Sequence, residues 1–223
     1  MPYILWDWNG TLLDDTAAGI GAFNEVFRRR GLPAMSRAWY RRHFAFPVRP
    51  VYAARGVELA HEDWDALARE YHDAYLRRPK ALNREARAAL SFVAAHGGGQ
   101  SIISALRQDL LDAAVEEFGI RSCFNFVYGV DNLDGATKLV RARELLARLR
   151  ERGVTGDVVL VGDAIHDWEV ARELGVGCVL CACGGHSIRR LRAVAPTGRT
   201  LLESVKLAFG GNRKIRQAVT RDA

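Results

Sequence analysis

The residues that can carry out chemistry in this 223-residue chain stand at the ends of short apolar runs. Asp7 follows the first run, Ser104 ends the second in "SIISALRQD", and Lys138 opens a helical stretch after the third. Asp163 follows the fourth run in "VVLVGDAIHD", with Asp167 four residues further on. We expect this carboxylate, hydroxyl, cation and acidic pair to converge on one site at the carboxyl edge of a parallel sheet.

This set of side chains suits phosphoryl transfer. Asp7 and Asp163 offer the hard oxygen ligands that Mg²⁺ prefers, and the ion would screen the repulsion between a carboxylate and a phosphate dianion. The other oxygen of Asp7 is free to attack phosphorus, while Lys138 neutralises charge on the nucleophile and on the transferred group. We assign the binding of phosphoryl oxygens to one hydroxyl and to backbone amides near the two strand ends, at Ser104, Ala105, Gly10 and Thr11.

Strands and helices alternate along most of the sequence. Apolar runs typical of buried parallel strands lie at 3–6, 101–104, 124–128, 158–161 and 178–180. Amphipathic helical stretches separate the later runs, and three of them end at a glycine that favours a left-handed cap, namely Gly119, Gly153 and Gly175. This alternation predicts a doubly wound, Rossmann-like α/β core.

One long region breaks the alternation. Between Asp15 and about Leu82 no run resembles a strand, and the apolar residues of "EDWDALAREYHDAYLRR" follow helical spacing. We therefore expect an all-helical insert, the cap, at 15–82, with the core formed by 1–14 and 83–223. An insert that leaves the carboxyl end of the first strand stands over the crevice where open α/β sheets bind ligands.

Positive charge is concentrated in this insert. The net charge of the chain is +6, and between Arg28 and Arg55 there are arginines but no acidic residue. Such a run fits a solvated basic face, a lid over a phosphorylated small molecule, or a nucleic-acid surface. We expect a small phosphorylated substrate and no nucleic acid, with Arg49 in "FAFPVRP" as the substrate-binding residue of the insert.

Composition excludes several classes of protein. With 49% hydrophobic and 26% charged residues the chain is globular, and no stretch approaches the ~20 apolar residues of a membrane span. Asp7 interrupts the first apolar run before it reaches signal-peptide length, so we expect a cytoplasmic protein without a membrane partner. The basic stretch "GGNRKIRQAVTR" is typical of a frayed tail.

The cysteines cluster in "CVLCACGGH", which suggests a zinc site with His186 as a fourth ligand. The paired CxxC units of structural zinc sites are absent, and Cys178 and Cys181 lie in an apolar run. We therefore interpret these cysteines as buried strand residues, since free cysteine is among the most buried residue types. The four cysteines are too few for a disulfide framework in a chain of this length.

The segments "DWNGT", "SIIS", Lys138 and "GDAIHD", in this order and at these strand ends, resemble the four motifs of the haloacid dehalogenase superfamily. The resemblance is to its phosphatase branch with a helical cap inserted after the first motif, and it covers 3–186. It implies an aspartyl-phosphate intermediate on Asp7. It also implies Mg²⁺ held by Asp7, the backbone carbonyl of Asn9 and Asp163, with Asp167 as a further ligand or next to one.

Asn9 departs from the family pattern. The family's phosphatases usually carry a second Asp at this position, which protonates the leaving oxygen and then activates water. An amide does not titrate and can only donate a hydrogen bond to the leaving oxygen. We therefore expect the enzyme to favour acyl, enol, aryl or anhydride phosphates, whose leaving groups depart as stable anions.

Relatives that lack the second Asp suggest three alternatives. A dehalogenase needs no acid, but does not resemble the metal-binding "GDAIHD". A C–P hydrolase forms an imine with a cap lysine, and the one lysine before Lys138 is Lys80, at the far end of the insert. A pseudo-enzyme would bind a phosphorylated ligand without turning it over. We expect a Mg²⁺-dependent phosphatase of a small phosphorylated metabolite.

Overall fold

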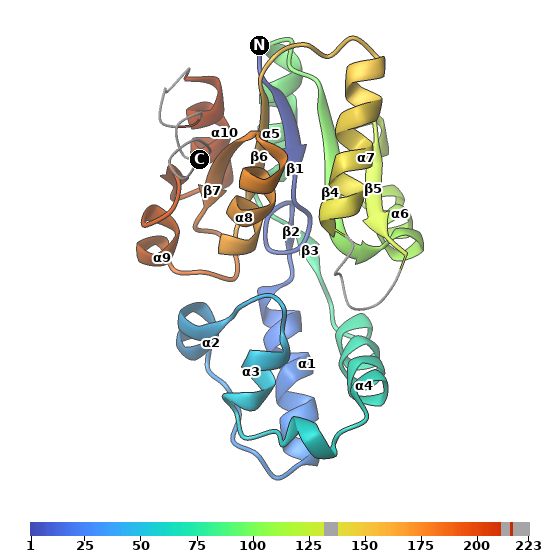
Figure 1. Cartoon of the computed structure of the whole chain (residues 1–223), viewed down its shortest axis with the longest axis vertical. Helices are drawn as coiled ribbons and strands as arrows, with labels where there is room; N and C mark the ends of the chain where they lie inside the picture. Colours follow the sequence, from blue (N-terminus) through green and yellow to red (C-terminus); the bar gives the residue numbers. More distant parts are fainter. Residues whose placement is uncertain (132–137, 211–214, 216–223) are drawn as a thin grey trace.

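A computed structural model of the chain describes residues 1–131, 138–210 and 215, and its core is a six-stranded parallel sheet of order β5-β4-β1-β6-β7-β8 (Figure 1). From the central β1 the chain builds outward to β4 and β5, then returns to the other side for β6, β7 and β8. The predicted doubly wound α/β core is therefore confirmed. The strands are β1 (Tyr3–Trp6), β4 (Gln100–Arg107), β5 (Val127–Val130), β6 (Val158–Gly162), β7 (Gly177–Cys181) and β8 (Thr197–Gly198).

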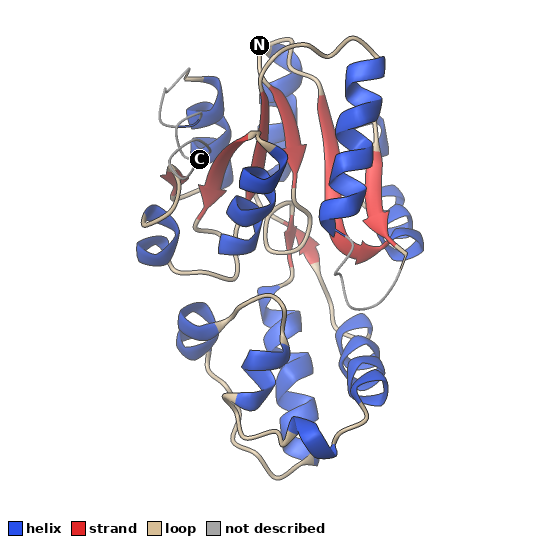
Figure 2. Ribbon diagram, viewed as in Figure 1, coloured by secondary structure: helices blue, strands red, loops and turns tan. Residues whose placement is uncertain are grey.

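Helices cover both faces of this sheet (Figure 2). Ile4 and Trp6 of β1 face one layer, whereas Tyr3 and Leu5 face the other, because successive side chains of a strand point to opposite sides. Burial on both faces is why the strands appear in the sequence as continuous apolar runs. The first layer holds α5 (Ala86–Ala95), α6 (Gln108–Glu117) and α10 (Leu201–Phe209), and the second holds α7 (Lys138–Glu151), α8 (Ile165–Leu174) and α9 (Ile188–Arg192).

Local signals located most of these elements. Gly119, Gly153 and Gly175 follow α6, α7 and α8 with φ of 62°, 77° and 67°, so the predicted left-handed caps are confirmed. The third strand was placed too early, at 124–128 instead of Val127–Val130. The preceding residues form a short 3₁₀ turn, η2 (Arg121–Cys123), after which Phe124 is buried in a connecting segment.

The region after β1 forms a separate group of helices at the carboxyl ends of the strands, which we call the helical lobe (Figure 1). Its own apolar core includes Phe23, Phe27, Tyr52 and Leu67. The chain enters and leaves the lobe through a short antiparallel pair, in which Leu13 lies opposite Leu82. This pair, β2 (Leu13–Asp14) with β3 (Ala81–Leu82), was not expected, because two residues give no detectable periodicity. The lobe contains α1 (Thr16–Arg29), α2 (Arg37–His43), α3 (Arg49–Ala53), the 3₁₀ turn η1 (Leu59–His61) and α4 (Trp64–Leu76).

Acidic residues outside the basic run neutralise part of it. Arg30 binds Glu62 at 2.6 Å and Glu70 at 3.0 Å, and Arg29 binds Glu70 at 3.3 Å. These arginines cross-link α1 to α4 and to the segment before it. They therefore contribute to the packing of the lobe and are less available for a nucleic-acid surface.

The cysteine cluster differs from expectation. Cys181 and Cys183 form a disulfide, while Cys178 is a free, buried thiol in β7. The chain turns directly after β7, which brings the Cα atoms of Cys181 and Cys183 to 5.3 Å from each other and lets the two sulfur atoms meet. The zinc hypothesis is not supported, and the expectation that all these cysteines are simply buried thiols was wrong for this pair.

No helix in the described part of the chain is long and apolar enough to cross a membrane. The cytoplasmic location stays a prediction. The predicted frayed tail at the C-terminus lies largely outside the described residues, with the exception of the buried Ile215. The residues 132–137, directly before Lys138, lie outside them as well, and the description resumes at Lys138.

Candidate active site

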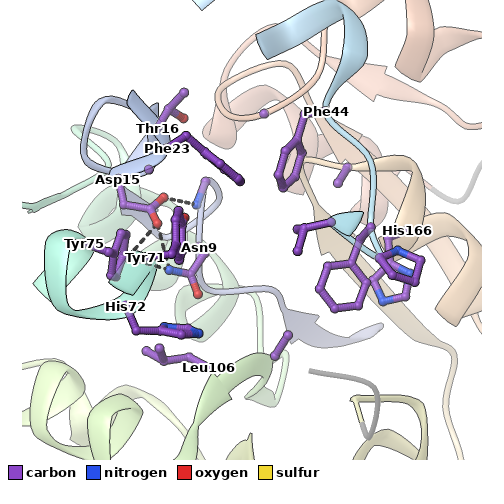
Figure 3. Close-up of a pocket in the computed structure, with 18 of the residues that line it drawn as sticks. Asn9, Asp15, Thr16, Phe23, Phe44, Tyr71, His72, Tyr75, Leu106 and His166 are labelled. Atoms are coloured by element: carbon purple, nitrogen blue, oxygen red, sulfur yellow. Dashed lines mark hydrogen bonds between the residues drawn. The ribbon is translucent and has the colours of Figure 1, made fainter. Parts of the chain in front are cut away.

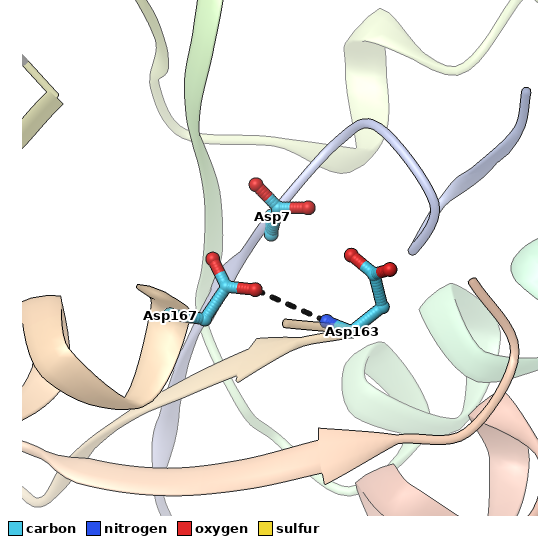
Figure 4. Close-up of side chains that lie close together, drawn as sticks. All are labelled: Asp7, Asp163 and Asp167. Atoms are coloured by element: carbon cyan, nitrogen blue, oxygen red, sulfur yellow. Dashed lines mark hydrogen bonds between the residues drawn. The ribbon is translucent and has the colours of Figure 1, made fainter. Parts of the chain in front are cut away.

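Two neighbouring strands deliver the two predicted metal-binding carboxylates to one place. Asp7 directly follows β1 and Asp163 directly follows β6, and these strands pair in parallel with Trp6 opposite Val161. Together with Asp167 from α8, they form a buried cluster whose ligand oxygens all lie within 4.8 Å of one another (Figure 4). The sheet register thus creates the acidic cluster that the sequence predicted.

Lys138 is the buried counter-charge of this cluster. As the first residue of α7, it donates from Nζ to Asp7 Oδ1 at 2.6 Å and to Asp167 Oδ1 at 2.8 Å. Burial raises the pKa of Asp7 to about 7 and the charge of Asp167 adds to this, while Lys138 opposes both. Although burial lowers the pKa of Lys138, the two carboxylates raise it above its ordinary value, so the lysine stays charged.

Asp167 holds both this lysine and the turn after β6. Its Oδ2 accepts hydrogen bonds from the backbone N–H groups of Asp163 at 3.1 Å and Ala164 at 3.0 Å. Thr11, a predicted phosphate-binding residue, donates instead from its hydroxyl to Asp7 Oδ2 at 3.1 Å and is fully buried. Both oxygens of Asp7 therefore have fixed partners, which orients the carboxylate.

The chemistry of this donor set fits a divalent cation. Three buried carboxylates, Asp7, Asp163 and Asp167, have one lysine among them, which leaves an excess of two negative charges. Burial, followed by the charges of Asp7 and Asp167, raises the pKa of Asp163 well above its ordinary value. Closely packed carboxylate oxygens with uncompensated charge are typical of Mg²⁺ sites.

Glycines allow the backbone to approach Asp163 closely. A Cβ at Gly10 would lie 2.6 Å from Asp163 Oδ2, and Gly10 has a φ of 78°, which a side chain would disfavour. The backbone N–H of Gly185 donates a hydrogen bond to the same oxygen. The Asn-Gly turn after β1 and the Gly-Gly turn after β7 therefore enclose the acidic cluster.

The amide of Asn9 is held by the start of the helical lobe (Figure 3). Its Nδ2 donates to Asp15 Oδ2 at 2.8 Å and to the Tyr75 hydroxyl at 2.8 Å, and Tyr75 donates in turn to Asp15 at 2.7 Å. A carboxylate only accepts hydrogen bonds, so this network fixes which end of the amide carries nitrogen. Both amide protons are used in this conformation, and the role of Asn9 toward a leaving oxygen stays a prediction.

Asp15 is a site residue that the sequence analysis missed. It is 8% exposed, lines the cavity and also accepts a hydrogen bond from the backbone N–H of Gly10 at 2.8 Å. Burial raises its pKa, an effect that its hydrogen bonds with Asn9 and Tyr75 oppose. The sequence showed an acid at the start of the insert, but nothing in it indicated that α4 would bury that acid against Asn9.

A cavity of about 600 Å³ lies between the acidic cluster and the helical lobe. Most of the site residues predicted from the sequence line this cavity, namely Asp7, Asn9, Gly10, Arg49, Ala105, Lys138, Asp163 and Asp167. Ser104 is 1% exposed and is not among the lining residues, and its hydroxyl accepts from the backbone N–H of Leu106 at 3.0 Å. Arg49 is exposed at the lobe side, where its guanidinium lies 4.4 Å from the centre of the Trp64 ring.

Hydrogen bonds join the lobe to the core beside the cavity. His186 donates from Nε2 to the Phe44 carbonyl at 2.8 Å and accepts at Nδ1 from the Ile165 N–H at 3.1 Å, which requires a neutral ring. Burial and the nearby charge of Arg190 lower the pKa of His186 to about 4. Arg41 donates to the carbonyls of Ala182 and His186 at 3.1 and 3.2 Å. These contacts fix α2 over the loop after β7.

Comparisons with known proteins agree with this geometry. A family model described as haloacid dehalogenase-like hydrolase matches residues 4–181. The probable phosphatase IndB of Dickeya dadantii (strain 3937) is 22% identical over 201 residues, which cover 87% of both chains. A predicted phosphoglycolate phosphatase from Haemophilus somnus 129PT has a similar structure, with a TM-score of 0.68, 17% identity, and coverage of 93% of this chain and 98% of that one.

Protein tyrosine kinase A (PtkA) of Mycobacterium tuberculosis is also similar in structure, with a TM-score of 0.75 and 21% identity over 94% of this chain and 98% of that one. At such identities these structures support the fold, whereas the family model covers most of the chain. The matched residues contain the carboxylates of β1 and β6 and the lysine of α7 in their order along the sequence. With its buried acidic cluster in that framework, the chain belongs to the haloacid dehalogenase-like hydrolases.

Proposed function

We propose that this hydrolase is a Mg²⁺-dependent phosphatase that acts on a small phosphorylated metabolite through an aspartyl-phosphate on Asp7. The observation that carries the proposal is the position of Asp7. It lies at the end of a central strand, oriented by Lys138 and Thr11, and faces a cavity beside Asp163. A carboxylate with this support is a suitable nucleophile for phosphorus.

In the first step an oxygen of Asp7 forms a bond to phosphorus, and the bond between phosphorus and the ester oxygen breaks. The leaving group departs with the electron pair of that bond. Lys138 remains beside Asp7 throughout and offsets the negative charge that gathers there. In the second step water displaces Asp7, which regenerates the carboxylate and releases inorganic phosphate.

Asp7, the backbone carbonyl of Asn9 and Asp163 would hold the Mg²⁺, with Asp167 next to them. When bound, the ion supplies positive charge that offsets repulsion between the carboxylates and a phosphate dianion. Of the four residues assigned to the phosphoryl group, Gly10 and Ala105 line the cavity and would contact it through their backbones. Thr11 and Ser104 do not line the cavity and would act behind it, Thr11 through its hydrogen bond to Asp7 and Ser104 through its hydrogen bond from Leu106. We propose that 15–82 forms the cap and that 1–14 and 83–223 form the core, with Arg49 on the substrate side of the cap.

The alternatives lack structural support of their own. Lys80 Nζ donates to the carbonyls of Tyr75 and Arg78, at 3.1 and 2.7 Å, and Lys80 is not among the residues that line the cavity. It is therefore poorly placed to form an imine with a substrate. The excess negative charge of the acidic cluster favours a metal-dependent reaction over halide displacement.

The test is phosphate release over a panel of acyl, aryl, sugar and nucleotide phosphates, with Mg²⁺ and with excess chelator. We expect activity that requires Mg²⁺ and falls at least ~10³-fold in Asp7→Asn, because that variant loses the nucleophile. The exposed Asp112→Asn serves as a control and should keep full activity. Activity that survives in Asp7→Asn or in chelator would contradict the mechanism, and Mg²⁺-dependent binding of phosphate esters without turnover would identify a pseudo-enzyme.

A further inference from the structure

We propose that the substrate is an aryl phosphate, a phosphate monoester of a phenol, whose ring lies against an aromatic wall of the helical lobe. The proposal rests on the proposed function, since it specifies the leaving group of that reaction. The aromatic wall consists of Phe23, Tyr40, Phe44, Tyr52, Trp64 and Tyr71, all of which line the cavity. The phosphoryl group would occupy the opposite end, beside the acidic cluster.

The aromatic wall is a continuous, preformed surface. Phe23 lies 4.7 Å from Tyr71 and 5.1 Å from Tyr52, measured between ring centres, and Tyr52 meets Trp64 edge to face at 5.7 Å. Phe44 faces Phe23 and Tyr71 across the cavity (Figure 3). Rings that already pack against one another lose little freedom when a further ring joins them, and aromatic pairs attract beyond simple burial.

Arginine and lysine side chains that could bind further anionic groups of a substrate are few around this cavity, although Asp65 and the histidines His72 and His166 also line it. Among the described residues that line it, Arg49 and Lys138 are the arginine and lysine side chains, and Lys138 is already bound to two carboxylates. A sugar phosphate would place several hydroxyls against the apolar ring faces of the aromatic wall, and each hydroxyl that finds no partner there costs free energy. An aromatic ring has no such requirement, and an anionic ring substituent could meet Arg49 at the mouth.

Two phenols provide the polar contacts that a substituted ring needs. A Cβ at Gly19 would lie 3.5 Å from the Tyr71 hydroxyl and 3.9 Å from the Tyr40 hydroxyl, so the glycine leaves room beside both groups. Burial raises the pKa of each phenol, so both remain neutral and can donate to a substituent of the ring.

The leaving-group chemistry supports an aryl ester independently of the wall. Asn9 uses both amide protons on Asp15 and Tyr75, so it offers none to the leaving oxygen. A phenol ionises near pH ~10, as the tyrosine side chain does, whereas water and alcohols ionise near ~15 or above. A phenolate can leave without a proton, but an alkoxide cannot do so at a useful rate.

The first experiment compares four substrates of the full-length protein with Mg²⁺: 1-naphthyl phosphate, phenyl phosphate, acetyl phosphate and glycerol 2-phosphate. Acetyl phosphate has a good leaving group but no ring, so it separates leaving-group chemistry from ring binding. We expect kcat/KM for 1-naphthyl phosphate to exceed that for acetyl phosphate at least about tenfold, and glycerol 2-phosphate to be the slowest.

The second experiment measures the ratio of kcat/KM for 1-naphthyl phosphate to that for acetyl phosphate in Phe44→Leu and Tyr71→Leu. Each variant should lower this ratio about three- to tenfold, mainly through KM for the aryl ester. Phe92→Leu makes the same change in a ring of similar burial outside the cavity and should leave the ratio unchanged. Hydrolysis of acetyl phosphate by each variant shows that it is folded.

The outcomes separate the two proposals. Two results would overturn the aryl proposal alone. One is Mg²⁺-dependent hydrolysis of acetyl phosphate or glycerol 2-phosphate without a preference for aryl esters. The other is an unchanged ratio of kcat/KM for 1-naphthyl phosphate to that for acetyl phosphate in both Phe44→Leu and Tyr71→Leu. If nothing is hydrolysed, calorimetric titration of 1-naphthyl phosphate into the Mg²⁺-loaded wild type decides. If the wild type binds 1-naphthyl phosphate, and Phe44→Leu weakens this binding while Phe92→Leu does not, the aryl ligand is supported and the proposed turnover fails. If the wild type does not bind it, both proposals are overturned.

Discussion

Asn9 and Asp15 form one hydrogen-bonded pair, in which the amide follows Asp7 by two residues and the carboxylate by eight. Asn9→Asp alone would place two carboxylates at the present 2.8 Å contact, where like charges repel. Combining Asn9→Asp with Asp15→Asn keeps the hydrogen bond and exchanges the roles of its partners. This exchanged pair would carry a titratable group at position 9, where family phosphatases usually carry one.

We expect the exchanged pair to raise kcat/KM for glycerol 2-phosphate about 10²-fold or more and to change aryl phosphate hydrolysis little, because only the alkoxide needs a proton. Asn9→Asp alone should give a smaller gain. Mass spectrometry of the peptide that contains Asn9 must accompany the kinetics, since an Asn-Gly pair can deamidate to aspartate. Equal hydrolysis of alkyl and aryl phosphates by undeamidated wild type would show that another group supplies the proton.

At the scale of elements, α3 brings Arg49 to the mouth of the cavity, where it stacks on Trp64 of α4. Arg49→Ala should raise KM several-fold and weaken the dependence of KM on salt, with a smaller effect on kcat, because the arginine attracts an anionic substrate before chemistry begins. Arg42→Ala removes an exposed charge of α2 outside the cavity and should do neither. Tight, salt-sensitive binding of RNA or DNA with unchanged kinetics in Arg49→Ala would favour a nucleic-acid surface instead.

The junction between α2 and α8 depends on a neutral His186, which links the Phe44 carbonyl to the Ile165 N–H. Its pKa of about 4 in the folded state lies below the ~6.5 of an unfolded chain, so the unfolded state binds more protons between these values. The stability that His186 contributes is therefore complete above pH ~6.5 and is lost as pH falls toward about 4.

Urea unfolding at several pH values tests this junction. The difference in unfolding free energy between wild type and His186→Asn should be largest near pH 7 and should shrink as pH falls from ~6.5 toward about 4. His61→Asn changes an exposed histidine of η1, and its difference from wild type should stay small across the range. A wild-type advantage over His186→Asn that grows as pH falls would show that the ring is protonated in the folded state.

At the scale of the whole molecule, the acidic cluster links metal binding to stability. If the cluster binds Mg²⁺ as proposed, we expect the ion at 100 times its Kd to add about 2.7 kcal/mol to the unfolding free energy, which would raise the midpoint of thermal unfolding by about 5 to 10 °C for a chain of this size. Asp163→Asn should abolish this rise. It should not lower the midpoint without metal, because burial and the charges of Asp7 and Asp167 disfavour the charged form of Asp163, as its raised pKa indicates, and the amide carries no charge.

Thermal unfolding with and without Mg²⁺ measures both effects. The exposed Asp112→Asn is the matched control and should retain the full rise. A metal-dependent rise that persists in Asp163→Asn would place the ion elsewhere.

The sequence by itself determined the α/β alternation, the three glycine caps and the order of Asp7, Lys138 and Asp163, because strand runs, helix ends and strand-end residues are local signals. From these a parallel sheet follows, and its carboxyl edge brings the carboxylates together. The register of β1 against β6 then turned two residues that are 156 positions apart into neighbours (163 − 7).

Tertiary structure alone decided how Asn9 is used and what surrounds the substrate. Tyr75 reaches Asn9 across 66 positions, and Asp15 is buried only because α4 packs against the start of α1. The aromatic wall draws its rings from α1, α2, α3 and α4, whose mutual packing no single stretch encodes. Local patterns specify elements and their ends, whereas the contents of a cavity depend on contacts between elements that are distant in sequence.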